Sequence, residues 1–197
     1  MPPTQWQSTT PEGKVEYCLQ RYGDIHKFLT VFSPKNILRY TQDAQQCCEY
    51  RSNAPTLNTM LRAYGRTAVI QWIMTLLVDL SEYACLPNGI DPNRLEEIAI
   101  YIYDENYHLR ASELMLFFSY VKRGKFGRIG YSTFDPITFM MMFPKFYVLR
   151  NQLIDMNIRE IEEEKERIAK SQPTKDRRED IKNLIARLGF GDSKHKK

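Results

Sequence analysis

The stretch RTAVIQWIMTLLVDLSEYACL, residues 66–86, decides the fold. Its apolar residues recur at steps of three and four, the spacing that places side chains on one face of an α-helix. These residues are Val69, Ile70, Ile73, Leu76, Leu77 and Leu80. The middle of the stretch is apolar nearly all round, so we expect a central, buried helix. The apolar run is interrupted by Gln71 and Asp79 and is too short to span a bilayer, so no membrane segment is expected.

The flanking sequence predicts further helices on both sides. Thr or Asp followed by Pro is a typical helix start, because the first side chain caps the helix and Pro fits its first turn. Such pairs stand at residues 10–11, 91–92 and 135–136, while Gly124 lies where a helix ends. Pro144 falls inside another helical pattern and should kink or split it. We therefore predict an all-α, compact multi-helix domain with only a short Gly-rich turn or β-ribbon near 124–134.

The chain divides into three predicted regions. A break near residues 53–55 separates an N-terminal helical region, residues 1–54, from a helical core at 55–156. Residues 157–197 form a charged helical extension with a basic tail. A short apolar stripe lies in that extension, at Ile181, Leu184, Ile185 and Leu188. This stripe either folds back on the chain or docks on a protein partner or a second copy, and the sequence does not decide between these.

Composition limits the classes of function. The net charge of +4 permits binding to a polyanion such as DNA but does not demand it. The four cysteines form no C-x-x-C pair, and there are only three histidines, so we expect no metal site and no cofactor. Neighbouring acids, such as Glu96 and Glu97, point in different directions on a helix, and Cys85 has no local histidine, so we expect no enzyme. The N-terminus lacks the pattern of a signal peptide, and we expect a cytoplasmic protein with reduced thiols.

The segment YVKRGKFGRIGY, residues 120–131, is the strongest candidate for a binding site. It holds four cations, three glycines and three aromatic residues without an acid. Its glycine spacing matches neither the dinucleotide fingerprint nor the P-loop. One interpretation is a nucleic-acid interface, in which the cations contact the sugar-phosphate backbone and Phe126 or Tyr131 stacks on a base. The cations are Lys122, Arg123, Lys125 and Arg128.

A structural interpretation of the same segment stays open beside the first. Lys122 and Arg123 would complement the dipole at a helix C-terminus, and the glycines would satisfy the geometry of a turn. The aromatic side chains would then pack into the core rather than face a ligand. The two interpretations differ in whether the cations and rings face solvent.

The middle of the chain also carries an ordered set of residues that resembles a known pattern. The set comprises Tyr64-Gly65, Asp79-Leu80, Ile98-Ala99, Glu113, Phe117-Phe118, the stretch KRGKFG at residues 122–127, Asp135, Phe146 and Arg150. It is similar to an uncharacterised family of small helical proteins from phages and mobile elements of gut bacteria. That family shares a lysine-arginine-glycine-x-phenylalanine-glycine core, then an aspartate, then an aromatic residue and an arginine. The resemblance covers about residues 60–152.

The resemblance implies a mobile-element setting and brings no activity with it. Together with the basic segment, it leads us to expect a non-enzymatic accessory protein of phage or mobile-element DNA metabolism, such as replication. The alternative is a protein-interaction or structural module, a virion component or a replication adaptor, that acts through its C-terminal helix.

Overall fold

The computed structural model describes residues 10–49, 51–130, 133–171 and 182–184. These residues form helices joined by short turns and contain no β-strand; Thr56 and Arg110 form an isolated bridge. The predicted all-α class is confirmed, and the described residues of the 124–134 segment contain no strand. Within the described ranges, no helix has both the length and the apolar character needed to cross a bilayer.

The helices follow one another closely along the chain. They are α1 (Pro11–Tyr22), α2 (Ile25–Val31), η1 (Pro34–Asn36), α3 (Arg39–Gln42), α4 (Ala44–Cys47), α5 (Leu57–Tyr64), α6 (Arg66–Tyr83), α7 (Pro92–Asn106), α8 (Ala111–Lys122), α9 (Pro136–Met140) and α10 (Met142–Ser171). Side chains of Thr10, Asp91 and Asp135 cap α1, α7 and α9 as predicted, each with a Pro in the first turn.

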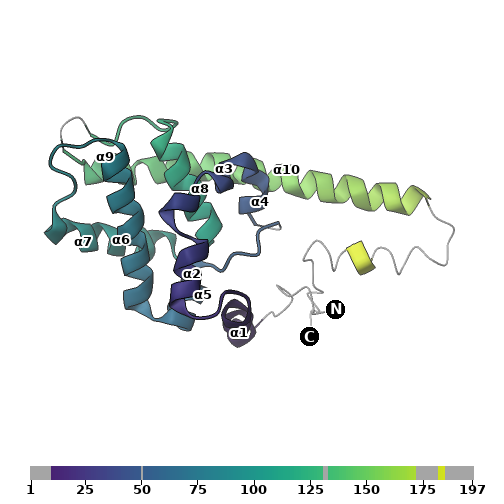
Figure 1. The fold of residues 1–197 in the computed structure, drawn as a ribbon. Helices are drawn as coiled ribbons and strands as arrows, with labels where there is room; N and C mark the ends of the chain where they lie inside the picture. Colours follow the sequence, from purple (N-terminus) through teal and green to yellow (C-terminus); the bar gives the residue numbers. More distant parts are fainter. Residues whose placement is uncertain (1–9, 50, 131–132, 172–181, 185–197) are drawn as a thin grey trace.

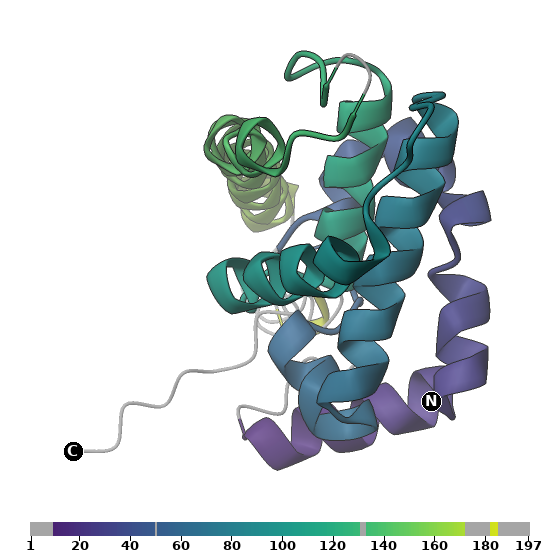
Figure 2. The same ribbon diagram turned by 90° about the vertical axis from the view of Figure 1, so that its left-hand side faces the viewer.

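Helix α6 lies at the centre of the molecule, as its sequence predicts. It runs beside α8, with α7 crossing it and α2 and η1 on another side (Figures 1 and 2). All six residues of its apolar pattern are buried. Trp72 lies on the same helix, where its indole N–H donates a hydrogen bond to the carbonyl of Phe32 at 2.9 Å. This bond satisfies a polar group that burial would otherwise leave unpaired.

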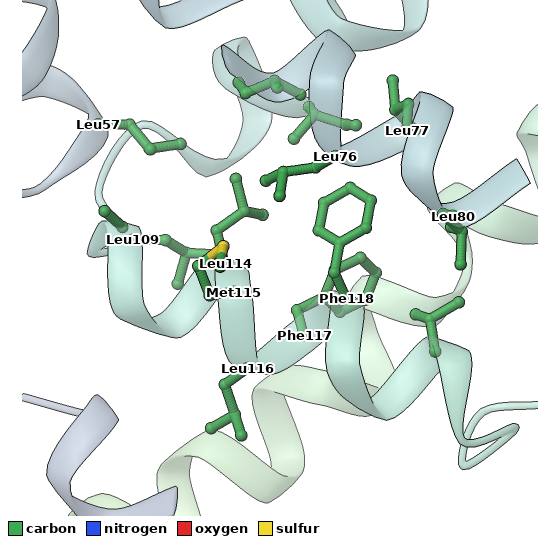
Figure 3. Packing of buried hydrophobic residues seen from close by; sticks show 14 of the residues in the cluster. Leu57, Leu76, Leu77, Leu80, Leu109, Leu114, Met115, Leu116, Phe117 and Phe118 are labelled. Atoms are coloured by element: carbon green, nitrogen blue, oxygen red, sulfur yellow. The ribbon is translucent and has the colours of Figure 1, made fainter. Parts of the chain in front are cut away.

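Helix α8 is the second core helix and is buried almost all round. Its residues from Ala111 to Val121 are all buried, so other elements cover every face. Leu114 and Phe118 lie toward Leu76 and Leu80 of α6 (Figure 3). Phe117 stacks on Phe143 of α10, with ring centroids 3.9 Å apart. Aromatic packing therefore joins α8 to the C-terminal part of the chain.

The N-terminal region packs on this core, a point that the sequence left open. Phe28 and Phe32 of the α2 segment are buried and contact Trp72 of α6 edge to face. Cys47 and Cys48 belong to the same hydrophobic cluster. The described residues before 55 therefore pack on the same core as those that follow.

The expected break at Pro144 falls slightly earlier in the chain. Helix α9 ends at Met140 and α10 begins at Met142, which leaves Pro144 in the first turn of α10. A Pro in the first turn removes an N–H that has no helical partner in any case, and its ring clashes only with the carbonyl four residues before it. That carbonyl belongs to Met140, where the previous helix ends.

Candidate nucleic-acid interface

The basic segment begins with a glycine turn that ends α8. The N–H of Gly124 donates to the carbonyl of Val121, and the N–H of Lys125 donates to the carbonyl of Tyr120. These two bonds define a Schellman motif, which needs a left-handed residue, and Gly124 has φ +70°. The helix end predicted at Gly124 is confirmed, and the chain reverses sharply there.

Lys122 does not face solvent as a free cation. Its ammonium lies 2.5 Å from the Asp79 carboxylate of α6, and its side chain is only 12% exposed. It also lies 5.0 Å from the ring centroid of Tyr83. The prediction that Lys122 contacts phosphates is corrected here, because its charge is compensated within the chain and ties α8 to α6.

Phe126 is likewise part of the core. It is 6% exposed, and its ring stacks on Phe117 with centroids 6.0 Å apart and meets Phe146 edge to face. The prediction that Phe126 stacks on a base is therefore wrong, because the core already covers the ring. Tyr131, the other predicted stacking residue, lies outside the described residues.

The remaining cations of the segment lie on its outer side. Arg123, Lys125 and Arg128 are all exposed, and the ammonium of Lys125 lies 4.1 Å from the ring centroid of Tyr120. Lys145 of α10 reaches the same turn and donates to the carbonyl of Phe126 at 3.1 Å. Sequence reasoning missed Lys145, since only the packing of α10 on α8 brings it near the turn.

Cations outnumber acids in the sequence around the turn. Residues 114–154 contain six cations and a single acid, Asp135. The Asp135 carboxylate accepts hydrogen bonds from Thr138 and from the first turn of α9, and the bonds from Thr138 lower its pKa. Arg150 and Lys122 are paired with acids from elsewhere in the chain. The exposed cations near the turn are Arg123, Lys125, Arg128 and Lys145, which we call the basic turn.

A cleft opens between the basic turn and the end of α6. Its volume is about 320 Å³, and one wall is apolar, formed by Leu80, Tyr83, Leu86 and Ile129. Lys122 and Arg128 contribute to its lining, as does the backbone of Gly124 and Gly127. Tyr83 is 59% exposed. The cleft thus combines an apolar wall and an aromatic side chain with nearby positive charge.

Several residues of the family resemblance prove to hold the fold together. Glu113 is fully buried and accepts hydrogen bonds from the Arg150 guanidinium at 2.7 Å and from the backbone N–H of Arg110 at 2.8 Å. Arg150 also lies 3.5 Å from the carboxylate of Glu49. These contacts join α8, α10 and the segment after α4, so the Glu113–Arg150 pair is structural.

Other predicted sites gain no support from the described residues. Among the residues that the structure describes, no group of three or more His, Cys, Asp or Glu side chains could hold a metal ion. Leu184 lies in a helical turn at 182–184, whereas Ile181, Ile185 and Leu188 of the predicted partner stripe lie outside the described residues. That stripe stays a prediction.

Comparisons with protein-family models, curated proteins and solved structures found no match.

Proposed function

We propose that the protein is a non-enzymatic accessory factor that binds nucleic acid through the basic turn. The observation that carries the proposal is the cluster of exposed cations at the turn that ends α8, beside the ion pair of Lys122 and Asp79. A surface of this kind attracts a polyanion and releases its counterions. The resemblance to phage and mobile-element proteins supports a role in the DNA metabolism of such an element, in the cytoplasm.

The buried and the exposed cations have different proposed roles. Lys122 and its partner Asp79 fix the end of α8 against α6, so the turn starts from a rigid position. Arg123 and Lys125 then project from the turn itself, and Lys145 reaches it from α10. Contacts of this kind read phosphate position rather than base sequence, so we expect affinity without strong sequence preference.

Charge reversal in the turn tests the proposal. The experiment measures fluorescence anisotropy of a labelled DNA oligonucleotide with the full chain and with a variant carrying Arg123→Glu and Lys125→Glu. We expect the variant to bind at least tenfold more weakly, because two cations are replaced by acids at the interface.

A matched variant controls for the change in net charge. Lys27→Glu with Arg159→Glu makes the same change at exposed positions of α2 and α10, remote from the turn in sequence. This variant should bind within about threefold of the unchanged chain. Equal weakening by both variants would show that net charge alone attracts the DNA, and the basic turn would lose its role.

A second candidate function, protein interaction, is favoured by the shape of α10. Ile161 is buried, and Glu160 pairs with Arg51 at 2.5 Å, but the helix continues to Ser171. In this last part, Arg167 pairs with Glu164 and Lys170 with Glu166, each within the helix. Figure 1 shows this end of α10 extending away from the other helices. An extended charged helix is a common means of reaching a partner or a second copy.

Light scattering on two chains separates this candidate from a monomeric DNA-binding protein. The full chain is compared with a chain ending after Glu164, which keeps Glu160 and Ile161 and so keeps the contacts of α10 with the body. Fewer chains per particle after truncation would support interaction through the extension. An unchanged monomer in both cases would remove self-association from the account.

A further inference from the structure

We propose that the cleft between the end of α6 and the basic turn holds one unpaired nucleobase of a single-stranded nucleic acid. The proposal rests on the proposed function and adds the class of nucleic acid and the site of the base. The nucleobase would lie against the apolar wall of the cleft while cations of the turn bind the neighbouring phosphates.

The size and lining of the cleft suit a single base. Ligand pockets in proteins range from about 300 to 1,000 Å³, and this cleft, at about 320 Å³, lies at the small end of that range. Its wall is formed by apolar side chains such as Leu80 and Ile129, against which a flat aromatic ring can pack. The exposed side chain of Arg128 also lines the cleft, which suits a ligand that joins a flat apolar part to a negative charge.

Tyr83 supplies the stacking surface that Phe126 does not. It stands at the last position of α6, lines the cleft and is 59% exposed, although most large aromatic residues of this end of the molecule are buried. Lys122, fixed by Asp79, lies 5.0 Å from the centroid of its ring. Base stacking on aromatic side chains tolerates any sequence, because every base presents a π-face.

The backbone around the cleft leaves room for a ligand to approach closely. A Cβ atom added at Gly124 or at Gly127 would meet no atom within 4 Å, so the space in front of both residues is open. Cys85, between the cleft residues Ala84 and Leu86, adopts φ +51°, a left-handed conformation that residues other than glycine rarely adopt. Backbone strain of this kind often accompanies binding sites.

The arrangement selects single strands over duplexes. In a duplex each base is paired and stacked between its neighbours, so its faces are covered and its ring cannot enter a side cleft without leaving the helix. In a single strand the bases can turn outward at little cost and stack on a protein side chain. The chemistry of the cleft does not distinguish deoxyribose from ribose.

The test compares oligonucleotides that share phosphates and differ in bases. Fluorescence anisotropy is measured with the full chain and three labelled probes of equal length: a single-stranded DNA, the same strand with abasic sites, and a duplex. Loss of one base stack costs on the order of fivefold to a hundredfold in affinity. We expect the single strand to bind at least fivefold more tightly than the abasic strand, and Tyr83→Ala to remove that difference.

Three further variants provide a rescue, a control and a second way of blocking the cleft. Tyr83→Trp should restore the preference for bases, because it returns an aromatic ring. Tyr101→Ala removes another exposed tyrosine, on α7, and should change nothing. Ala84→Leu fills the cleft at an exposed position with an ordinary helical backbone, so it repeats the test if Tyr83→Ala fails to fold.

The outcomes separate this inference from the function on which it rests. Equal affinity for intact and abasic strands, with binding that still weakens after reversal of the basic turn, overturns the base site and leaves nucleic-acid binding in place. Failure of all three probes to bind overturns both.

Discussion

At the scale of single residues, a buried ion pair joins α8 to α10. Glu113 is fully buried and Arg150 is 13% exposed, and they meet at 2.7 Å. Removing one partner of such a pair leaves an uncompensated charge in the interior, whereas keeping both satisfies the desolvated groups.

Replacing Glu113 therefore has a large predicted effect. Glu113→Ala should lower the free energy of unfolding by about 3–5 kcal/mol, because Arg150 and the N–H of Arg110 lose their shared acceptor. Chemical denaturation followed by circular dichroism measures the change. Glu82→Ala, at an exposed position of α6, serves as the control and should change stability little. A loss below about 1 kcal/mol for Glu113→Ala would contradict the structural role of the pair.

His108 gives the chain a predicted dependence on pH. Partial burial and then the charge of Arg150 lower the pKa of His108 below its ordinary value of 6.5. The unfolded chain therefore binds this proton more readily than the folded chain, so stability falls as pH decreases through 6.5 and levels off below the folded pKa. His108→Phe preserves the stacking on Tyr147 and removes the titrating group. Melting temperatures between pH 7.5 and 5.5 should then fall less than in the unchanged chain; an equal fall would assign the effect to other groups.

At the scale of elements, the turn after α8 depends on glycines for two different reasons. Gly124 has φ +70° with open space around it, so an alanine there meets strain in the backbone alone. Gly130 has φ +151°, and an added Cβ would lie 1.9 Å from the carbonyl oxygen of Thr133. The backbone of the turn must move in the second case.

The two glycines should therefore respond differently to substitution. Gly124→Ala should destabilise the chain by about 1 kcal/mol, the cost of a left-handed residue, and Gly124→Asn should cost less because Asn tolerates that conformation. Gly130→Ala should cost more than Gly124→Ala, since it adds a clash. Melting temperatures of the three variants measure the order of their stabilities. A Gly130→Ala variant as stable as the unchanged chain would contradict the described turn.

The elements also show where sequence reasoning succeeds. The sequence predicts the apolar period of α6 correctly, because this pattern depends on residues close together in the chain. The same holds for the helix caps at Thr10, Asp91 and Asp135. The contacts of Lys122 and Phe126 with other helices could not be predicted from the sequence, because the same side chains also suit a solvent-facing turn. Lys145 and Tyr83 join the candidate site only through packing.

At the scale of the whole molecule, a single helical core carries the basic turn at one end, and helix α10 extends away from that core. Helices α6 and α8 carry the core, and the end of both helices meets the basic turn (Figures 1 and 2). Helix α10 crosses α8 and then continues past its last buried residue, Ile161. The resulting shape separates the end that we propose binds a polyanion from the extension that we propose reaches a partner.

The dependence of binding on salt tests the central claim most directly. Each phosphate contact with single-stranded DNA contributes about −0.7 to the slope of log association constant against log salt. The four cations of the basic turn predict a slope of about −3, which should become shallower by about 1 or more in the Arg123→Glu and Lys125→Glu variant. Association that is absent at low salt, or that is unchanged as salt rises, would contradict the account.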